Sequence, residues 1–329
     1  MILAGDVGGT KTVLAMFQTR SDGGVTLVHE RIYASGAYPD FDDLLVDFLD
    51  DVSDLPSTVC LGVAGPVFEQ RCEATNLPWA IEAKHLSRRH GLGDVRLLND
   101  LEAMALGMLH LDEAESIALN PGAESRSGNR AVIAAGTGLG EAVLVFDGTG
   151  YRPMATEGGH ADLAAVDAQQ DEVLNYLRRR FNGHVSYERI LSGNGFGYLY
   201  DFLVDSGYGP RCDEVELAHA ALGLDRNAVI SRLGLEAADP VCAEALRLFI
   251  TFYGQEAGNL AMRSLARGGV FIGGGIAPKI QAHLADGTFL NAFTNKGRFH
   301  DMLSKVPITL ALDPRIPLRG CAHFLSLRA

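Results

Sequence analysis

The sequence predicts an α/β protein of two lobes, and three observations support this fold class. Short apolar runs typical of strands alternate with longer segments whose apolar residues recur every three or four positions. The chain has 329 residues, more than one compact lobe usually holds. Two glycine-turn hairpins of similar pattern, at 2–17 and 131–146, lie one in each half of the chain. Their positions favour a duplicated architecture with a cleft between the lobes.

The first half of the chain begins with the stretch ILAGDVGGTKTVLAMF (2–17), which indicates a strand, a glycine turn and a second strand. The stretch VCLGVAGPV, which starts at Val59, predicts a buried strand that ends in Gly-Pro. The stretch VRLLNDLEAMALGML then changes from a strand to a helical pattern at Asn99 and Asp100. Such a polar pair is either a helix N-cap, with Asp100 as the capping residue, or a site at the carboxyl edge of a sheet.

The second half begins with a polar stretch, NPGAESRSGNR, which predicts an exposed loop. The second hairpin, AVIAAGTGLGEAVLVF, follows it and aligns with the first when Phe17 is matched to Phe146 and Gly9 to Gly138. Helical spacing is then present in DEVLNYLRRRF, YERILSGNGFGYLYDFLV and DPVCAEALRLFITFYGQEAGNLAMRSL. The segments GGVFIGGGIAPKI and VPITLALDPRIPLRGCAHFLSL each predict one more strand followed by a helix.

Charge and cysteine content exclude several classes of protein. Asp and Glu outnumber Lys and Arg by 41 to 28, which gives a net charge of −13 and disfavours nucleic acid and anionic membranes as partners. An anionic substrate stays open, because local donors or a metal ion can hold a phosphate in an acidic protein. The five cysteines form no C-x-x-C pair, so we expect neither a disulfide framework nor a zinc site. The chain starts without a leader-like segment and has no apolar run of membrane length, so we expect a cytoplasmic protein.

The first hairpin turn is a candidate phosphate site. Gly8 and Gly9 can take positive φ and present bare N–H groups to phosphate oxygens, although a plain turn would explain the two glycines as well. Asp6 would repel a phosphate unless a divalent cation lies between them, and Mg²⁺ with ATP supplies one. Neither hairpin matches a Walker A loop or a dinucleotide fingerprint, since a strand rather than a helix follows each turn.

A third glycine cluster, Gly273 to Gly275, precedes the predicted helix of GGGIAPK. One interpretation is that these glycines allow close packing of the helix on the strand. The other is that they leave room for a flat ring such as adenine.

A set of carboxylates, an amide and an imidazole suits the binding of a ring of hydroxyls by paired donor and acceptor bonds. The chain offers such a set in Asn99, Asp100, Glu157, His160 and Glu188. Taken singly, Glu157 and Glu188 are explained by a solvated carboxylate and His160 by a structural histidine. Phosphoryl transfer to a sugar hydroxyl needs a carboxylate that accepts the proton, and Asp100, at a strand-to-helix junction, is best placed for this role.

Several motifs occur in order along nearly the whole chain, namely GDVGGTKT, LLND, AAGTGLG, EGGHADLA, GHVSYERILSG and VFIGGGIAPK. In these motifs the sequence resembles the bacterial glucokinase family, specifically the branch similar to the enterobacterial enzyme. The resemblance implies ATP-dependent phosphorylation of D-glucose at the 6-hydroxyl, giving glucose 6-phosphate and ADP. It also implies the two-lobed actin-like ATPase (ribonuclease H-like) fold, with duplicated domains and a central cleft that closes on the substrates.

The resemblance further implies roles for individual residues. Asp100 is expected to be the general base, and Asp6 is expected to face Mg²⁺ through water. The glucose hydroxyls are expected to contact Asn99, Asp100, Glu157, His160 and Glu188. The implied ATP-binding residues are Gly5, Asp6, Val7, Gly8, Gly9 and Thr10 in the first turn, Thr137 and Gly138 in the second, and Gly274. The stretches VAGPV and NLPW (76–79) resemble sugar-side loops.

The resemblance also sets expectations for domains and assembly. We expect a small domain at 1–112, completed by a C-terminal helix near 315–329, and a large domain at 113–314. We expect a homodimer, because relatives in the family often form one, and no structural zinc, because HADLAAVDAQQDE lacks the cysteines of the repressor/kinase branch. The segment RIPLRGCAHF differs from the glycine-rich stretch of the family, so the packing of the last helix is left open.

Three alternatives to this function stay open. The acceptor can be another hexose or an amino sugar, because hydroxyl geometry is not visible in a sequence. The phosphoryl donor can be polyphosphate or ADP. The chain can also be a non-catalytic sugar sensor on the same fold, although it has no helix-turn-helix before its first strand.

Overall fold

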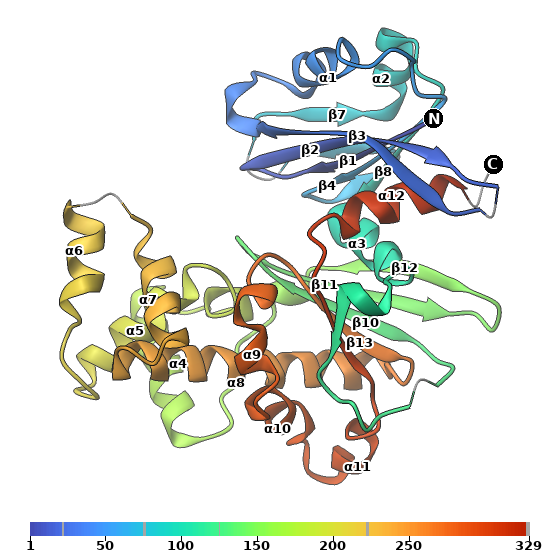
Figure 1. The fold of residues 1–329 in the computed structure, drawn as a ribbon. Coiled ribbons are helices and arrows are strands. Elements are labelled where there is room, and N and C mark those ends of the chain that lie inside the picture. Colours follow the sequence, from blue (N-terminus) through green and yellow to red (C-terminus); the bar gives the residue numbers. More distant parts are fainter. Residues whose placement is uncertain (22, 75–76, 125, 222–223, 327–329) are drawn as a thin grey trace. The chain divides into compact units, whose positions relative to one another are not determined.

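The computed structural model describes residues 1–329 apart from 22, 75–76, 125, 222–223 and 327–329 (Figure 1). The chain forms two compact units. Unit 1 contains Met1–Glu115, Pro153–Ala155 and Asp313–Ala329, and unit 2 contains Ser116–Arg152 and Thr156–Leu312. Among the described residues, no helix combines the length and the apolar character needed to cross a membrane.

Unit 1 is built on five main strands, a smaller three-stranded sheet and four α-helices. Its strands are β1 (Ile2–Val7), β2 (Lys11–Thr19), β3 (Val25–Ala34), β4 (Thr58–Val63), β5 (Val67–Phe68), β6 (Arg71–Glu73), β7 (Ala80–Glu82) and β8 (Asp94–Asn99). Its helices are α1 (Phe41–Leu49), α2 (Ala83–His90), α3 (Asp100–Met108) and α12 (Ile316–Ser326), with the 3₁₀ turns η1 (Ser35–Ala37) and η2 (Glu113–Glu115). The main sheet has the order β3-β2-β1-β4-β8. Strands β1, β4 and β8 are parallel neighbours, so they end at the same edge of the sheet.

Helices cover both faces of this main sheet. Side chains alternate along β1, so that Leu3 and Val7 pack with α1 and α2 while Ile2 and Ala4 pack with α3 and α12. Figure 1 shows α1 and α2 on one side of the sheet and α3 with α12 on the other. Burial on both faces explains why the central strands are almost continuously apolar.

The C-terminal helix α12 packs on α3 at very short range. A Cβ at Gly320 would lie 1.8 Å from Ala103 O, and a Cβ at Gly107 would lie 2.1 Å from Ile316 O. Only glycine fits at either position, because the close atoms belong to the backbone. The packing of RIPLRGCAHF, which the sequence left open, therefore depends on the single glycine in that segment.

Unit 2 contains a six-stranded sheet with the order β12-β11-β10-β13-β14-β9 and eight α-helices among its described residues. Its strands are β9 (Ser116–Ala118), β10 (Arg130–Ala135), β11 (Leu139–Phe146), β12 (Tyr151–Thr156), β13 (Gly269–Gly273) and β14 (Ile308–Ala311). Its helices are α4 (Ala168–Arg180), α5 (Gly195–Asp205), α6 (Asp213–Ala221), α7 (Arg226–Leu235), α8 (Pro240–Ser264), α9 (Gln281–Leu284), α10 (Thr288–Thr294) and α11 (His300–Leu303). The 3₁₀ turns are η3 (Gly158–His160), η4 (Tyr187–Arg189), η5 (Ala277–Ile280) and η6 (Gly297–Phe299).

The long helix α8 lies in the core of unit 2. Asp239 caps it by accepting hydrogen bonds from Val241 N at 3.0 Å and Cys242 N at 2.9 Å, and a proline occupies its first turn. Its aromatic residue Phe249 stacks on Phe196 of α5 with ring centroids 4.3 Å apart. The helix predicted from apolar spacing over 239–265 is thereby confirmed.

The two sheets repeat one topology. Each has an antiparallel hairpin, β1-β2 or β10-β11, whose first strand pairs in parallel with a later strand, β4 or β13. The strand orders β3-β2-β1-β4-β8 and β12-β11-β10-β13-β14 therefore correspond, and β9 is an additional edge strand in unit 2. The α/β fold class and the duplicated architecture are confirmed.

The predicted alignment of the two hairpins is wrong in detail. The first turn leaves four residues (8–11) between the last paired residues of its strands, whereas the second leaves three (136–138). The counterpart of Phe17 is therefore Leu144 rather than Phe146. A sequence pattern cannot reveal this shift, since apolar residues continue along β11 on both sides of Leu144.

The helix predicted across YERILSGNGFGYLYDFLV starts later than its spacing suggests. Residues Tyr187–Arg189 form the short 3₁₀ turn η4, and α5 starts only at Gly195. The chain bends so sharply there that a Cβ at Gly195 would lie 1.6 Å from Ile190 O. Glu188 therefore precedes the helix, and its side chain is not part of a helical surface.

Gly320→Ala is expected to destabilise the protein, because the new Cβ would overlap the backbone of α3. The loss should be about 3 kcal/mol, which for a chain of this size lowers the melting temperature by roughly 4 °C. Gly122→Ala is the matched control, since no atom lies near a Cβ at that position. Calorimetric melting of both variants checks the prediction, and equal melting temperatures would contradict the close packing of α12 on α3.

Candidate active site

Three expected site residues lie at one edge of the main sheet of unit 1. Asp6, near the end of β1, pairs in register with Gly62 of β4, and Asn99 ends β8 opposite Val63. Neighbouring strands are about 5 Å apart. Asp6 and Asp100, which follows Asn99, therefore flank the end of β4.

Asn99 caps helix α3. Its Oδ1 accepts a hydrogen bond from Leu101 N at 3.0 Å, and its own N–H donates to Glu102 Oε2 at 3.1 Å, which completes a capping box. Its Nδ2 donates to Gly65 O at 3.1 Å. Asp100 is the first helical residue, so the interpretation of Asp100 as the cap is wrong.

The Asp100 carboxylate lies partly exposed in the first turn of α3, where the helix dipole favours negative charge. Its Oδ1 accepts a hydrogen bond from Leu101 N at 2.9 Å. Cys72 of β6 is affected by this carboxylate. Burial and, next, the Asp100 charge raise the pKa of the Cys72 thiol. The thiol therefore stays protonated beside the carboxylate.

A buried serine holds the first glycine turn. Ser35 N–H donates to Thr10 O at 3.1 Å, while its Oγ donates to Gly8 O at 2.7 Å and lies 2.9 Å from Thr12 Oγ1. These bonds use the carbonyl groups of the turn rather than its donors. The N–H groups of Gly9 and Thr10 have no acceptor in the described part of the chain, so they are available to a ligand.

Space, rather than positive φ, explains the glycines of this first turn. The positive-φ glycines of the described chain do not include Gly8 or Gly9, so the expected left-handed conformation is wrong. A Cβ at Gly8 would lie 3.0 Å from Lys11 O, and a Cβ at Gly5 would lie 2.5 Å from Leu61 Cδ2. Glycine at these positions lets the backbone pack closely. The N–H of Gly8 itself donates to Lys11 O at 3.1 Å, so the prediction of a bare N–H is wrong for Gly8.

Asp6 is the anionic group next to the first turn. Burial raises the pKa of Asp6 to about 6, and the Lys11 ammonium opposes this shift. A cation at the carboxylate would favour its ionised form. No group of three or more His, Cys, Asp or Glu side chains among the described residues could hold a metal alone. A Mg²⁺ ion here would therefore take most of its ligands from water and phosphate, which is its usual preference.

In unit 2, Glu188 binds the second glycine turn directly. Its Oε2 accepts a hydrogen bond from Leu139 N at 3.0 Å, and a Cβ at Gly138 would lie 2.4 Å from that oxygen. Gly136 N–H closes the turn by donating to Gly138 O at 2.8 Å. Elsewhere in the turn, the N–H groups of Thr137 and Gly138 have no acceptor among the described residues. The second turn thus offers two donors beside a carboxylate.

His160 lies between two carboxylates. Its Nε2 is 3.9 Å from Glu157 Oε2, and its Nδ1 is 3.9 Å from Glu188 Oε1. Both separations exceed a hydrogen bond, so a hydroxyl group can bond to each partner instead. The turn η3 is packed tightly on β11, since a Cβ at Gly159 would lie 2.1 Å from Leu139 O. The structure therefore groups the three predicted sugar-binding side chains of unit 2.

Gly274, the residue after β13, lies next to the second glycine turn. Its φ is +84°, and a Cβ there would lie 2.3 Å from Ala135 O, so glycine is needed on both grounds. Ile276 N–H donates to the same oxygen at 3.2 Å. Because Ala135 ends β10, Gly274 lies next to the start of the second turn.

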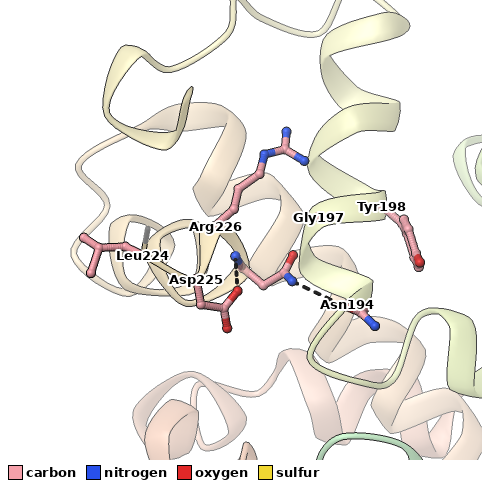
Figure 2. A pocket seen from close by; sticks show the side chains of 7 residues that line it. Asn194, Gly197, Tyr198, Leu224, Asp225 and Arg226 are labelled. Atoms are coloured by element: carbon pink, nitrogen blue, oxygen red, sulfur yellow. Dashed lines mark hydrogen bonds between the residues drawn. The ribbon is translucent and has the colours of Figure 1, made fainter. Parts of the chain in front are cut away.

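A pocket of about 570 Å³ lies between α5 and α7 and adjoins the second turn (Figure 2). Gly193 N–H donates to Gly136 O at 2.9 Å, and the next residue, Asn194, lines the pocket. Asn227 Nδ2 donates to Asn194 Oδ1 at 3.3 Å, and Asn227 N–H donates to Asp225 Oδ1 at 2.9 Å. The lining residues are Asn194, Gly197, Tyr198, Leu224, Asp225, Arg226 and Asn227.

The predicted residues form two sets, one in each unit. Unit 1 carries Gly5, Asp6, Val7, Gly8, Gly9, Thr10, Asn99 and Asp100, and unit 2 carries Thr137, Gly138, Glu157, His160, Glu188 and Gly274. Sequence reasoning missed Ser35, which has no motif and resembles any loop serine, and it missed the pocket. Trp79 of NLPW is buried and donates from Nε1 to Tyr38 O at 3.3 Å, whereas Asn76 lies outside the described residues.

Comparisons with known proteins identify the family. The family model described as Glucokinase matches residues 3–328. A glucokinase of a Nostoc species is 33% identical and covers 98% of this chain and 98% of its own length. A glucokinase of Chromobacterium violaceum is 36% identical and covers 98% of this chain and 89% of its own length. The crystal structure of a glucokinase from an Antarctic psychrotroph matches at a TM-score of 0.84 and 30% identity, over 98% of both chains.

The resemblance of the motifs to glucokinases is thereby confirmed, together with the actin-like ATPase fold. A family match over nearly the whole chain and relatives above 30% identity leave the enzyme class established. The chain belongs to the glucokinase family, the enzymes that phosphorylate glucose with ATP.

Proposed function

We propose that the chain transfers the γ-phosphoryl group of ATP to the 6-hydroxyl of glucose, with Asp100 as general base. The observation that carries this proposal is the division of roles at the start of α3, where Asn99 caps the helix and Asp100 is the first helical residue. The test is an assay that follows ADP release from Mg-ATP with glucose, mannose, fructose and glucosamine. Turnover with glucose well above the others supports the proposal, whereas a better acceptor than glucose contradicts it.

The reaction needs one proton transfer and one exchange of P–O bonds. The Asp100 carboxylate accepts the proton of the 6-hydroxyl as that oxygen attacks the γ-phosphorus. The new O–P bond forms while the bond from the γ-phosphorus to the bridging oxygen breaks, and ADP leaves with that electron pair. The helix N-terminus and the Leu101 N–H favour the ionised carboxylate, which is the form that accepts a proton.

Glu157, His160 and Glu188 would orient the sugar. The 3.9 Å separations on both sides of His160 leave hydrogen-bonding positions for hydroxyls. Because Glu188 also binds Leu139 N–H, the sugar-binding side chains and the second turn belong to one packed assembly. Such an assembly favours a fixed distance between the hydroxyl and the γ-phosphate. Asn99 would contribute its remaining capacity, since Oδ1 accepts one bond from Leu101 N and Nδ2 donates one to Gly65 O, which leaves one acceptor position and one N–H for a hydroxyl.

The two glycine turns would bind the phosphates. Four N–H groups are available for phosphate oxygens, those of Gly9, Thr10, Thr137 and Gly138. Asp6 would hold Mg²⁺ beside the first turn through water. When bound, the ion supplies the positive charge that offsets the negative charge of the phosphates.

Gly274 and the pocket between α5 and α7 would hold the adenosine. Both border the second turn, because Gly274 contacts the end of β10 and Asn194 follows the residue bonded to Gly136. The ring of Tyr198 and the apolar side chain of Leu224 offer a surface for a flat base, and Asn227 offers an amide.

Asp100→Asn is expected to lower kcat by about 10²–10⁴-fold, because the amide cannot accept the proton. Glucose affinity, measured by calorimetry, should change little, since the amide keeps the size of the carboxylate. Asp94→Asn is the control, because Asp94 begins β8, the strand that leads into α3, and makes an exposed ion pair with Arg96. A wild-type kcat in the Asp100 variant would show that another group is the base.

The Asp6 carboxyl should give the reaction an acid limb. Its pKa is raised to about 6, so the carboxyl is ionised above this pH and neutral below it, and kcat/KM for Mg-ATP should fall as the pH drops through about 6. Lys11→Met removes the cation that opposes this shift, so the fall should move to higher pH. Initial rates between about pH 5 and pH 8 check this. If kcat/KM falls at the same pH in the Lys11 variant, the titrating group is on the nucleotide. That result would contradict the role of Asp6.

Ser35→Ala should loosen the first turn. The substitution leaves Gly8 O and Thr12 Oγ1 without their buried partner, which costs about 1–3 kcal/mol. KM for ATP is expected to rise while glucose affinity is unchanged. Ser57→Ala is the control, since Ser57 Oγ makes one exposed bond to Met1 O. Steady-state kinetics and melting of both variants decide, and an unchanged KM for ATP would refute the role of Ser35.

A further inference from the structure

A buried network of charged and polar side chains lies in the core of unit 2, and the proposed mechanism does not use it. Its carboxylates, Glu141 and Glu256, are 1% and 0% exposed. Buried carboxylates are costly unless they are paired, so their presence under a binding site needs an explanation. The members are Glu141 of β11, Glu256, Asn259 and Arg263 of α8, Tyr187 of η4, and Lys296.

One end of the network is a pair of carboxyl groups around a single guanidinium group. Arg263 Nη2 contacts Glu256 Oε1 and lies 3.4 Å from Glu141 Oε2. The other oxygen of Glu141, Oε1, is buried without a hydrogen-bond donor. The single arginine therefore satisfies Glu141 only in part.

The other end reaches the segment that carries Glu188. Asn259 Nδ2 donates to Glu256 Oε2 at 2.9 Å and to Tyr187 Oη at 3.0 Å. Lys296 Nζ donates to Asn259 Oδ1 at 2.7 Å. Because Tyr187 is the neighbour of Glu188 in the chain, the network anchors this sugar-side segment.

Glu141 itself supports the second sugar-side segment. A Cβ at Gly158 would lie 2.1 Å from Glu141 Oε2, so the carboxyl group packs directly against the backbone of η3. Thr156 strengthens this contact, since its Oγ1 donates to Glu141 O at 3.0 Å and accepts from Gly158 N–H at 3.2 Å. Gly158 follows Glu157 and precedes His160 by two residues, so the carboxyl group contacts the short backbone segment that carries both side chains.

We propose that Glu141 is a positioning residue for glucose, whose carboxyl group supports Gly158 and so fixes Glu157 and His160. The inference rests on the proposed function of these two residues in binding the sugar. Together with Tyr187 at the far end, one buried network would then position both sugar-side segments of unit 2.

The protonation state of Glu141 agrees with this role. Burial and, next, the Glu256 carboxylate raise the pKa of Glu141 to about 8, and Arg263 opposes the shift. At neutral pH Glu141 is therefore protonated and carries no charge beside the Glu256 carboxylate. Above about pH 8 two buried carboxylates would share one arginine, and their repulsion would disturb the support of Gly158.

The other titratable groups around this pair differ in how they respond to pH. Burial lowers the pKa of Lys296, and burial raises the pKa of both Tyr187 and Tyr253. The tyrosines therefore stay neutral above the pH at which Glu141 ionises. The groups that act on the pair are Arg263 and Tyr253 of α8, Tyr187 of η4 and Lys296 after α10. The turn η3, which contacts Glu141 through Gly158, carries His160 and follows Glu157.

Glu141→Gln tests the proposal, because the amide keeps the size of the carboxyl group and is neutral at every pH. Glucose affinity is measured by calorimetry without nucleotide, and KM and kcat by steady-state kinetics, from about pH 7 to pH 9.5. In the wild type, glucose KM and Kd should rise about tenfold as the pH passes 8, with kcat nearly constant. In the Gln variant both should stay at their neutral values across the range.

The matched control is Glu244→Gln. Glu244 lies on α8, the helix that carries Glu256, and pairs with Arg247 and Gln169. This variant should keep the alkaline loss of the wild type. A loss that persists unchanged in the Glu141 variant, or a wild type whose affinity is flat, would overturn the proposal.

Glu141→Ala removes the support altogether, so glucose KM should rise about tenfold at neutral pH while KM for ATP stays within about twofold. If this variant fails to fold, the pH profile of the Gln variant decides alone. An alanine variant that folds and keeps the wild-type glucose KM would overturn the proposal. Wild-type protein that binds no glucose at any pH would instead contradict the proposed function.

Discussion

Parallel strands that end at one edge of a sheet are the constraint on which the rest of this structure depends. In unit 1, β1, β4 and β8 end together, and the chain must turn after each of them. Backbone donors at such turns need partners. Asn99 supplies one for helix α3, while the turn after β1 leaves N–H groups for a ligand. Unit 2 repeats the arrangement at the ends of β10 and β13. Backbone N–H groups without acceptors and carboxylates therefore occur together at the ends of these strands.

Glycines allow carboxylates to contact the backbone near these strand ends, because glycine has no Cβ in the way. Gly138 admits Glu188, and Gly158 admits Glu141 from below. Each contact fixes a loop by packing against its main chain rather than by a second side chain. The first contact joins a proposed sugar-binding side chain to a proposed phosphate-binding turn, and the second joins η3 to the buried charges of α8. Orientation of the substrates then follows from rigid packing, which is an efficient source of catalysis.

Much of the fold and the location of the candidate residues could be predicted from the sequence, because they depend on local patterns. Apolar spacing and capping residues predict the strand-to-helix junction at Asn99 and Asp100, and they predict the helix over 239–265. The remainder depends on contacts between distant segments. The one-residue difference between the hairpin turns, the role of Ser35 and the burial of Glu141 all follow from tertiary packing, which a single sequence does not encode in any short motif. Of the two glycines predicted to present bare N–H groups, Gly9 does so, whereas Gly8 N–H donates to Lys11 O at 3.1 Å, and neither takes the expected positive φ.

The central claim is that the Asp100 carboxylate accepts the proton of the glucose 6-hydroxyl. A crystal structure with glucose and a non-hydrolysable ATP analogue tests it most directly. The account predicts a distance of about 2.6–3.2 Å between the 6-hydroxyl oxygen and a carboxylate oxygen of Asp100, with other hydroxyls bonded to His160 and Glu188. Glucose bound to the unit 2 residues with its 6-hydroxyl turned away from Asp100, and no other ligand in its place, would contradict it.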